Sequence, residues 1–184
     1  MSHSLYSRQG DKGSTCLPAD PHTQVSKDDL VIEFYGTAEE LNANLGLLKS
    51  KLTLDSPALG EVAEIQRQLY ALSLSDSNAC PVEHTQIQQL ENWIDAKLAL
   101  LPNQNSAILP GGDTNAALAY ICRSICRRAE RIAVRLNKQG LASPLIIAYL
   151  NRLSDYFLVL ARRINQRQGV SDTPLKPTTT STQD

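Results

Sequence analysis

The sequence predicts an all-α protein, a five-helix bundle with an irregular N-terminal leader and a disordered C-terminal tail. Apolar residues recur three or four positions apart through most of the chain, which is the spacing of one helix face. No segment alternates apolar and polar residues convincingly, as a half-buried strand does. The chain has 184 residues, 42% of them apolar. This length and composition suit one well-buried core and are short for two.

The two ends differ in composition from the middle of the chain. Residues 1–33 show no regular pattern, and the final stretch, DTPLKPTTTSTQD, is polar and rich in proline and threonine. Such segments order poorly unless a partner binds them. We therefore expect a leader over residues 1–33, a bundle domain over residues 34–169 and a disordered tail over residues 170–184.

The first three helices are predicted from capping and apolar spacing. Thr37 followed by Glu40 is a capping-box signature, which places the start of the first helix at Thr37. The apolar stripes of the three helices are Leu41, Leu45, Leu48 and Leu52, then Val62, Ile65, Leu69 and Leu72, then Ile87, Leu90, Ile94 and Leu98.

The fourth and fifth helices have clearer boundary signals. Asp113 is suited to cap a helix over about residues 114–137, and Gly140 follows its end. Ser143 and Pro144 form a cap and first-turn pair for a fifth helix that ends near the next glycine. The apolar stripe of this helix is Ile146, Leu150, Leu153, Phe157, Leu160 and Ile164.

Charge and composition exclude several function classes. The formal net charge is −1, which argues against a broad nucleic-acid footprint. No apolar run has signal-peptide length or approaches the roughly 20 residues of a membrane span, so we expect a cytoplasmic protein without a membrane partner. The four cysteines have neither metal-ligand nor disulfide spacing, and no protein metal site is predicted. Cys122 and Cys126, one turn apart, are interpreted as small buried residues rather than a redox or metal pair.

The fourth predicted helix contains an unusually basic stretch, CRSICRRAERIAVR. At 100° per residue, Arg123, Arg127 and Arg131 lie within an arc of about 80° on one face of the helix. Arg128 and Arg135 extend this face. The neighbouring apolar stripe is Leu118, Ile121, Ile125 and Ile132. Stacked like charges destabilise a helix, so the pattern suggests an absent anion such as a polyphosphate. The alternative is a solvated face, or arginines paired with acids of other helices such as Glu39.

Two further features each allow two interpretations. Asn151 and Asp155, one turn apart on the fifth helix, could bind a ligand or a magnesium-bound water, or could satisfy a neighbouring helix end. Gly10 and Gly13 flank an Asp-Lys pair in YSRQGDKGSTC. This composition is typical of a simple turn, although a loop that folds closely over a phosphate could have it too. The stretch lacks the glycine spacing of a P-loop.

Six blocks of the sequence together resemble one protein family. In order, they are YSRQGDKGSTCL, VSKDD, EFYGTAEELNANLGL, ILPGGDTNAAL, CRSICRRAER and YLNRLSDYFLVLARRIN. Their order and spacing are similar to those of the PduO-type ATP:cob(I)alamin adenosyltransferases, also called corrinoid adenosyltransferases. The blocks cover most of residues 6–165, so the resemblance is specific although each block alone is weak evidence.

The resemblance implies a five-helix bundle that assembles as a homotrimer, with each active site between two subunits. It implies that the reduced cobalt of cob(I)alamin, or of a related corrinoid, attacks the 5′ carbon of Mg-ATP and releases triphosphate. ATP and the corrinoid would thus be substrates, with Mg²⁺ accompanying ATP. A reductase or an adenosylcobalamin-dependent enzyme would be a partner.

The resemblance also implies roles for individual residues. Arg127 and Arg131 would hold the triphosphate, and Glu39 would pair with Arg127 across the bundle to position it, which makes these three the candidate catalytic residues. Asn151 would bind the nucleotide. The other candidate binding residues lie in the leader and in the arginine signature: Ser7, Arg8, Gln9, Gly10, Thr15, Lys27, Arg128, Ala129 and Glu130.

Four positions depart from the family pattern. Gln9 precedes the first glycine where most members have threonine, Glu39 replaces an aspartate, and Tyr120 replaces a histidine that is common there. Ala107 stands where the family has a phenylalanine, an aromatic implied to displace the lower ligand of cobalt. Two alternatives to the enzyme remain: a catalytically weakened carrier of ATP or adenosylcobalamin, and a helical scaffold whose arginines pair with the acids of a partner.

Overall fold

The computed structural model describes residues 6, 8–18, 20–53, 56–74, 80–104 and 106–175. Over this part of the chain the helices are α1 (Leu30–Lys51), α2 (Ala58–Leu74), α3 (His84–Leu98), α4 (Thr114–Lys138) and α5 (Pro144–Arg167). Strand β1 (Ser14–Leu17) pairs antiparallel with β2 (Asp20–Ser26), and β3 (Ile108–Leu109) pairs antiparallel with β4 (Thr173–Pro174). The predicted all-α bundle of five helices is confirmed, with two small strand pairs added to it.

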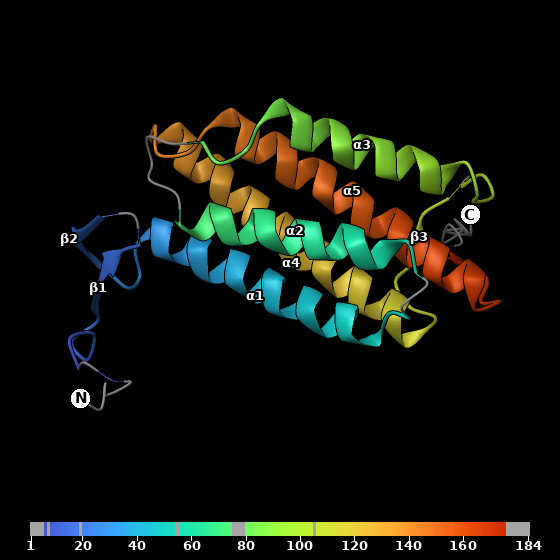
Figure 1. The fold of residues 1–184 in the computed structure, drawn as a ribbon, viewed down its shortest axis with the longest axis horizontal. Coiled ribbons are helices and arrows are strands. Elements are labelled where there is room, and N and C mark those ends of the chain that lie inside the picture. The colour runs from blue at the N-terminus through green and yellow to red at the C-terminus, as the bar shows by residue number, and fades with distance from the viewer. Residues whose placement is uncertain are drawn as a thin grey trace, which may run out of the picture.

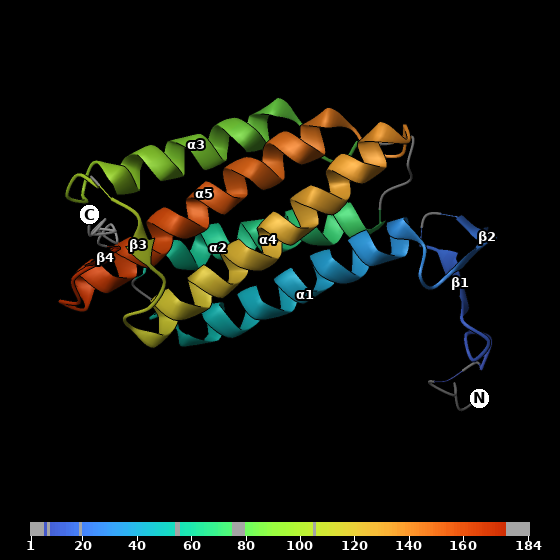
Figure 2. The same cartoon turned by 180° about the vertical axis from the view of Figure 1, so that it is seen from behind.

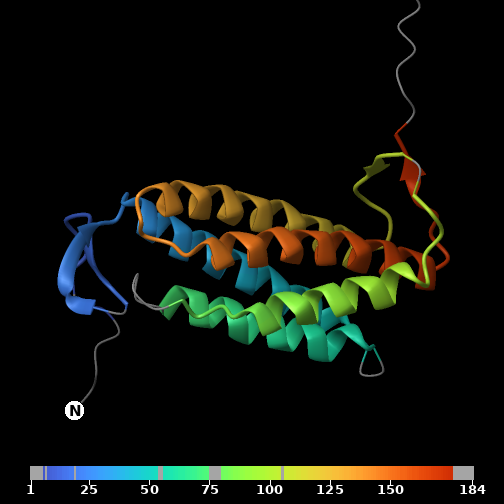
Figure 3. The same ribbon diagram turned by 90° about the horizontal axis from the view of Figure 1, so that it is seen from above.

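The helices pack in the order α2–α1–α4–α5–α3, so that α4 lies between α1 and α5. Figure 2 shows α1, α4, α5 and α3 side by side. The β1–β2 hairpin lies beyond the end of the bundle where α1 begins, and the β3–β4 pair lies at the opposite end (Figures 1 and 3). The long α4 therefore runs from the end of the bundle with the β3–β4 pair to the end with the β1–β2 hairpin.

Most of the predicted apolar stripes form the core. Every predicted stripe residue of α5 is buried, as are the central leucines of α1 and α2. Leu98 and Ile121 are exceptions, with 43% and 47% of their surface exposed. Leu98 is the last residue of α3, and Ile121 lies in a groove between α1 and α4. The prediction that Ile121 belongs to the buried stripe of α4 is therefore wrong.

The first helix begins at Leu30 rather than at the predicted Thr37. Asp29 is its N-cap, because the Asp29 carboxylate accepts a hydrogen bond from the backbone N–H of Val31 at 2.9 Å. The Thr37 hydroxyl instead donates to the carbonyl of Glu33, one turn back, at 2.8 Å. This bond is common for threonine inside a helix, so the apparent capping box at Thr37 is a mid-helix coincidence.

The boundary signals of α4 and α5 are confirmed. The Asp113 carboxylate accepts from the backbone N–H of Asn115 at 2.8 Å, and the Ser143 hydroxyl accepts from that of Leu145 at 3.2 Å. Gly140 ends α4 with a φ of 75°, a left-handed conformation that suits glycine. By length and composition α5 could also cross a membrane, but 56% of its most apolar window is buried inside the bundle.

Short strands occur in both segments that were expected to be irregular. In the hairpin, Thr15 lies opposite Val25. Most of β2 is exposed and polar, so the hairpin is held by backbone pairing and leaves no alternating apolar pattern in the sequence. In the expected tail, β4 pairs with β3 and the Leu175 N–H donates to the Ala107 carbonyl at 2.7 Å. Residues 176–184 lie outside the described part of the chain.

Candidate functional site

Two arginines of α4 are paired with acids on α1. Arg128 forms an ion pair with Glu40, and Arg135 Nη2 lies 3.1 Å from Glu33 Oε2. The side chains of both pairs are about half exposed, and exposed pairs of this kind stabilise a protein only weakly. The predicted alternative of pairing with acids on another helix is therefore correct for these two arginines.

Arg127 and Arg131 remain exposed on the outer face of α4. Neither forms an ion pair with any residue in the described part of the chain. Their neighbour Arg123 is half-buried, and its Nε atom has no hydrogen-bond partner there. Three of the five arginines are thus left with unused hydrogen-bond donors, which is the arrangement expected of a site for a polyanion.

Glu39 does not form the predicted pair with Arg127 within the chain. Glu39 is exposed and makes no ion pair with a described residue, whereas the adjacent Glu40 binds Arg128. Consecutive helix residues point about 100° apart. Because Glu40 faces α4, Glu39 is turned away from it, so the Glu39–Arg127 pair is not formed within one chain and stays a prediction.

The predicted nucleotide-binding asparagine contacts the arginine signature. Asn151 Nδ2, on α5, donates to Glu130 Oε1, on α4, at 3.0 Å. Asn151 is exposed and Glu130 is half-buried, so the amide is oriented while its oxygen remains available. Ala129 differs from its neighbours, because it is fully buried in the core. Its side chain cannot contact a ligand, which corrects its place among the binding residues.

Asp155 has a structural role. Its Oδ2 atom accepts from Arg152 Nη1 at 3.0 Å, and Arg152 Nε donates to Glu91 Oε1 on α3 at 3.1 Å. The carboxylate therefore belongs to an ion-pair network between α5 and α3. Of the two candidates one turn apart on α5, only Asn151 lies with the arginine signature.

The leader residues form a compact unit around the hairpin. Lys27 donates its backbone N–H to the Gly13 carbonyl at 2.8 Å, and a Cβ placed on Gly10 would lie 2.9 Å from Lys27 Nζ. Thr15 is half-buried in β1. The Arg8 guanidinium lies 5.5 Å from the centre of the Tyr6 ring. The end of the Lys27 side chain thus lies over the turn at Gly10.

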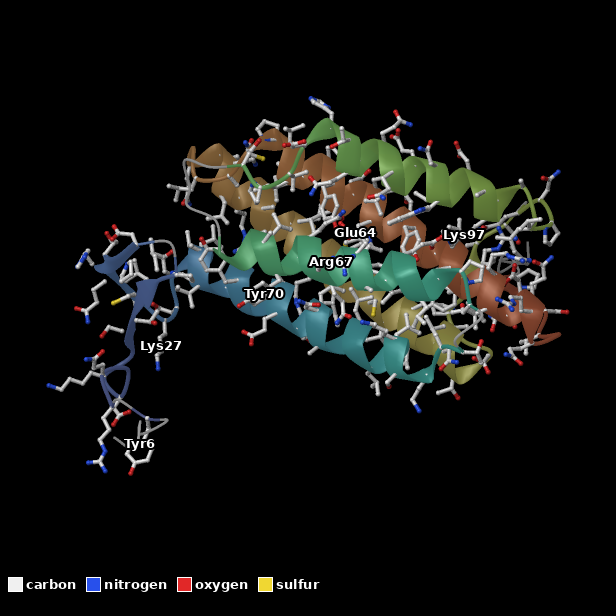
Figure 4. The ribbon with its side chains drawn as sticks, in the orientation of Figure 1. Tyr6, Lys27, Glu64, Arg67, Tyr70 and Lys97 are labelled. Atoms are coloured by element: carbon white, nitrogen blue, oxygen red, sulfur yellow. The ribbon has the colours of Figure 1, made fainter. Side chains whose placement is uncertain are left out.

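Not every predicted leader residue can be placed in this unit. Gln9 is exposed in the turn, and Ser7 lies outside the described residues. The unit itself, with Tyr6 and Lys27, lies beyond the end of the bundle in Figure 4. Within a single chain the leader therefore extends beyond the bundle.

A groove with a volume of about 540 Å³ runs between α1 and α4. Arg128 and Arg131 line one part of it, and Ile121 contributes exposed apolar surface. The remaining lining residues are Glu40, Asn44, Pro110, Gly111, Ala117, Tyr120, Ser124 and Ile125. No binding role was predicted for Glu40, Asn44 or Tyr120. Neither the pairing of Glu40 nor the burial of Tyr120 has a local signal in the sequence, because both depend on how α1 and α4 pack.

The loop before α4 is held in place by hydrogen bonds to the Asn165 side chain of α5. Asn165 is 3% exposed; its Nδ2 donates to the Gly111 carbonyl at 3.0 Å and its Oδ1 accepts from the Asp113 N–H at 2.9 Å. Gly112 lies directly on this amide with a φ of 100°, and a Cβ there would clash with it. Ala107, at the other end of the loop, is exposed.

The C-terminal segment is tied to the same end of the bundle by a buried ion pair. Arg162 is 3% exposed, its Nε donates to Asp172 Oδ2 at 2.8 Å, and its Nη2 donates to the Pro102 carbonyl at 2.9 Å. Burial and the Asp172 charge raise the pKa of the Tyr120 hydroxyl. The hydroxyl is therefore protonated and available as a donor.

The buried cysteines have no catalytic features. Burial raises the pKa of Cys122 to about 12 and that of Cys126 well above its ordinary value. Neither is a thiolate near neutral pH, and a thiolate is required for nucleophilic attack or metal binding. Within the described ranges, no group of three or more His, Cys, Asp or Glu side chains is placed to hold a metal ion.

Comparison with known proteins gives a consistent result. A family model described as cobalamin adenosyltransferase matches residues 5–164. A corrinoid adenosyltransferase of Bacillus subtilis is 37% identical over 177 residues, covering 91% of this chain and 90% of the relative. A cobalamin adenosyltransferase of Cupriavidus metallidurans is 39% identical over 170 residues, covering 91% of each.

Solved structures give a similar result. A PduO-type ATP:corrinoid adenosyltransferase from Lactobacillus reuteri, in a variant with histidine in place of a phenylalanine and complexed with cobalamin and ATP, superimposes with a TM-score of 0.85. It is 29% identical, with 95% of this chain and 97% of that chain covered. A variant with alanine in place of phenylalanine, also complexed with cobalamin and ATP, has a TM-score of 0.83 and 31% identity, covering 94% of this chain and 99% of that one.

Proposed function

The chain belongs to the cobalamin adenosyltransferase family, and we propose that it transfers the 5′-deoxyadenosyl group of ATP to cobalt. The acceptor is cob(I)alamin or a related corrinoid, and the second product is triphosphate. The observation that carries this function is the pair of exposed, unpaired arginines on α4, Arg127 and Arg131, beside the oriented amide of Asn151.

The chemistry of the transfer explains why arginines dominate the site. The cobalt electron pair forms the bond to C5′ while the C5′–O bond breaks, and its electrons leave on triphosphate. No proton has to be moved, so a general base is not needed. The chain must instead position the two substrates and neutralise the charge on the leaving group. Arg127, Arg131 and the Lys27 ammonium supply positive charge for this purpose, and Asn151 orients the nucleotide.

We propose that a complete site requires two copies of the chain, arranged in a homotrimer. Glu39 and Arg127 are both exposed and unpaired, and they face away from each other within one chain. The β1–β2 hairpin lies beyond the end of the bundle at which α1 begins. A neighbouring copy could supply both missing contacts, an acid for Arg127 and a leader over the phosphates.

The remaining components follow from the substrates. Mg²⁺ is proposed to arrive with ATP, since this ion binds phosphates with one or two protein oxygens and several waters; the Glu130 carboxylate and the free oxygen of Asn151 fit that need. The cytoplasm is the proposed location, because the described cysteines are free thiols, as in reducing compartments. A reductase that delivers cob(I)alamin and an enzyme that uses the product are proposed partners.

The function is tested by following cob(I)alamin consumption spectroscopically with Mg-ATP under strong reductant. The wild type should form adenosylcobalamin, and Arg131→Ala should lose about 100-fold or more in rate, the effect of removing one donor to a developing anion. The matched control is Arg67→Ala, an exposed arginine on α2 that pairs with Glu64 (Figure 4) and should keep the wild-type rate. A wild-type protein that binds ATP but forms no adenosylcobalamin would refute the proposed function.

A further inference from the structure

Two aliphatic side chains are exposed in the middle of long helices. Leu47 on α1 and Ile121 on α4 each keep 47% of their surface exposed. The other large aliphatic side chain exposed on the described helices is Leu98, which is the last residue of α3. Single exposed apolar residues are ordinary, whereas neighbouring ones indicate a contact surface. The question is therefore whether Leu47 and Ile121 lie together.

The ion pairs between α1 and α4 show that they do. Arg128 of α4 pairs with Glu40 of α1, and the second pair lies seven residues further along each helix, in opposite directions. Seven residues are nearly two full turns, so each step of this size returns to almost the same face. One step the other way from Arg128 and Glu40 places Leu47 opposite Ile121. The two exposed side chains therefore form one apolar patch at the α1–α4 groove.

Unpaired charges of both signs flank this patch. Glu39 lies about two turns from Leu47 along α1, and Arg127 lies less than two turns from Ile121 along α4. Both charged side chains are exposed, and neither pairs with a described residue. A surface with an unpaired acid, an unpaired arginine and an apolar patch between them is complementary to a second copy of itself.

Gly36 is a second indication that another chain approaches this face. It is exposed inside α1, and a Cβ placed on it would meet no described atom within 4 Å. Glycine inside a helix is less favourable than alanine, and it is used where a backbone approaches closely. At 100° per residue, Gly36, Glu39 and Leu47 lie within about 80° around α1. The space at Gly36 is thus on the side that carries the apolar patch and the unpaired acid.

We propose that Leu47 and Ile121 form the apolar centre of the contact between copies that completes the site, with α1 of one copy packed against α4 of the next. The inference rests on the proposed function and adds to it the surface that holds the copies together. An antiparallel alignment that brings Glu39 to Arg127 of the partner subunit also brings Leu47 within one turn of Ile121 of the partner subunit. Without this contact Arg127 lacks its acid, so assembly and Mg-ATP affinity are lost together.

The test measures the mass of the assembly by light scattering over a range of concentrations, with circular dichroism to follow helix content. Leu47→Asp should keep the wild-type helix content, because the side chain is half exposed. It should raise the dissociation constant between copies about 30-fold or more, the loss expected at an interface centre, and weaken Mg-ATP binding. Ile121→Asp is an independent second variant with the same expected result. The matched control, Leu100→Asp, changes a leucine that is 58% exposed just after α3 and should keep the wild-type mass and affinity.

The outcomes separate this inference from the proposed function. If the wild type is an active assembly and both aspartate variants keep its mass, the inference is overturned while the enzyme stands. A wild type that is active as a monomer overturns it as well. If the wild type forms no adenosylcobalamin, the proposed function fails, while dissociation of Leu47→Asp still supports the contact. An Ile121→Asp protein that keeps its mass but loses cobalamin affinity would assign this residue to a ligand, which also overturns the inference.

Discussion

Replacing Asn165 by alanine should destabilise the fold. The side chain makes two hydrogen bonds, to the Gly111 carbonyl at 3.0 Å and from the Asp113 N–H at 2.9 Å. Its removal leaves two backbone groups without partners, each worth about 1–3 kcal/mol when buried. Both groups lie in half-buried residues, where water can partly replace the amide. We therefore expect a loss of about 2–3 kcal/mol in the free energy of unfolding, using the lower part of that range.

This loss can be measured by urea and thermal unfolding. A destabilisation of that size lowers the thermal midpoint by about 5–10 °C in a chain of this length. The matched control is Asn137→Ala, which removes one amide-to-backbone bond, to the Ala142 carbonyl at 2.7 Å, at the opposite end of α4. The control should lose about half as much stability as Asn165→Ala. An Asn165→Ala protein with the wild-type urea midpoint would refute the reasoning.

Three further outcomes are expected. Burial raises the pKa of Cys122 from 9.0 to about 12, so above pH 9 the unfolded chain releases a proton that the folded chain keeps. The free energy of unfolding should fall by about 1.4 kcal/mol per pH unit from this group, and urea midpoints at pH 8–11 should fall less steeply for Cys122→Ala. Ala107→Phe should increase the rate of adenosylation from cob(II)alamin and reductant, because an aromatic below cobalt favours the four-coordinate corrinoid; an unchanged rate would contradict this. Trypsin cleavage after Arg8 and Lys12 should slow when Mg-ATP is added, as followed by mass spectrometry, and equal cleavage with and without ATP would count against a phosphate-covering leader.

The bundle was largely predictable because the sequence signals for its helices are local and recur over several turns. Each long helix has several turns of apolar residues, and Asp113 and Ser143 give cap signals that nothing nearby competes with. The start of α1 was misplaced because Asp29 and Thr37 both satisfy a capping pattern. Sequence alone does not show which of them lies at the end of the helix, since that depends on where the chain leaves the bundle.

The site was predicted in its residue types but not in its pairing. The spacing of the α4 arginines identified the anion-binding face. It could not show that Arg128 is bound to Glu40 while Arg127 is left unpaired, because that depends on which side of α1 faces α4. The hairpin was missed because its strands are exposed and polar.

The packing order of the helices has a consequence for how the protein opens. α3 packs mainly against α5, and its side-chain hydrogen bonds to α2 include an ion pair between Lys97 and Glu61, which also accepts the Tyr156 hydroxyl. Lys97 lies near the C-terminal end of α3 (Figure 4). An outer helix held by one apolar face and a polar contact is the natural first unit of partial unfolding. The amides of α3 should exchange with solvent deuterium before those of α4. The arginine face of α4 should therefore remain folded after α3 has opened.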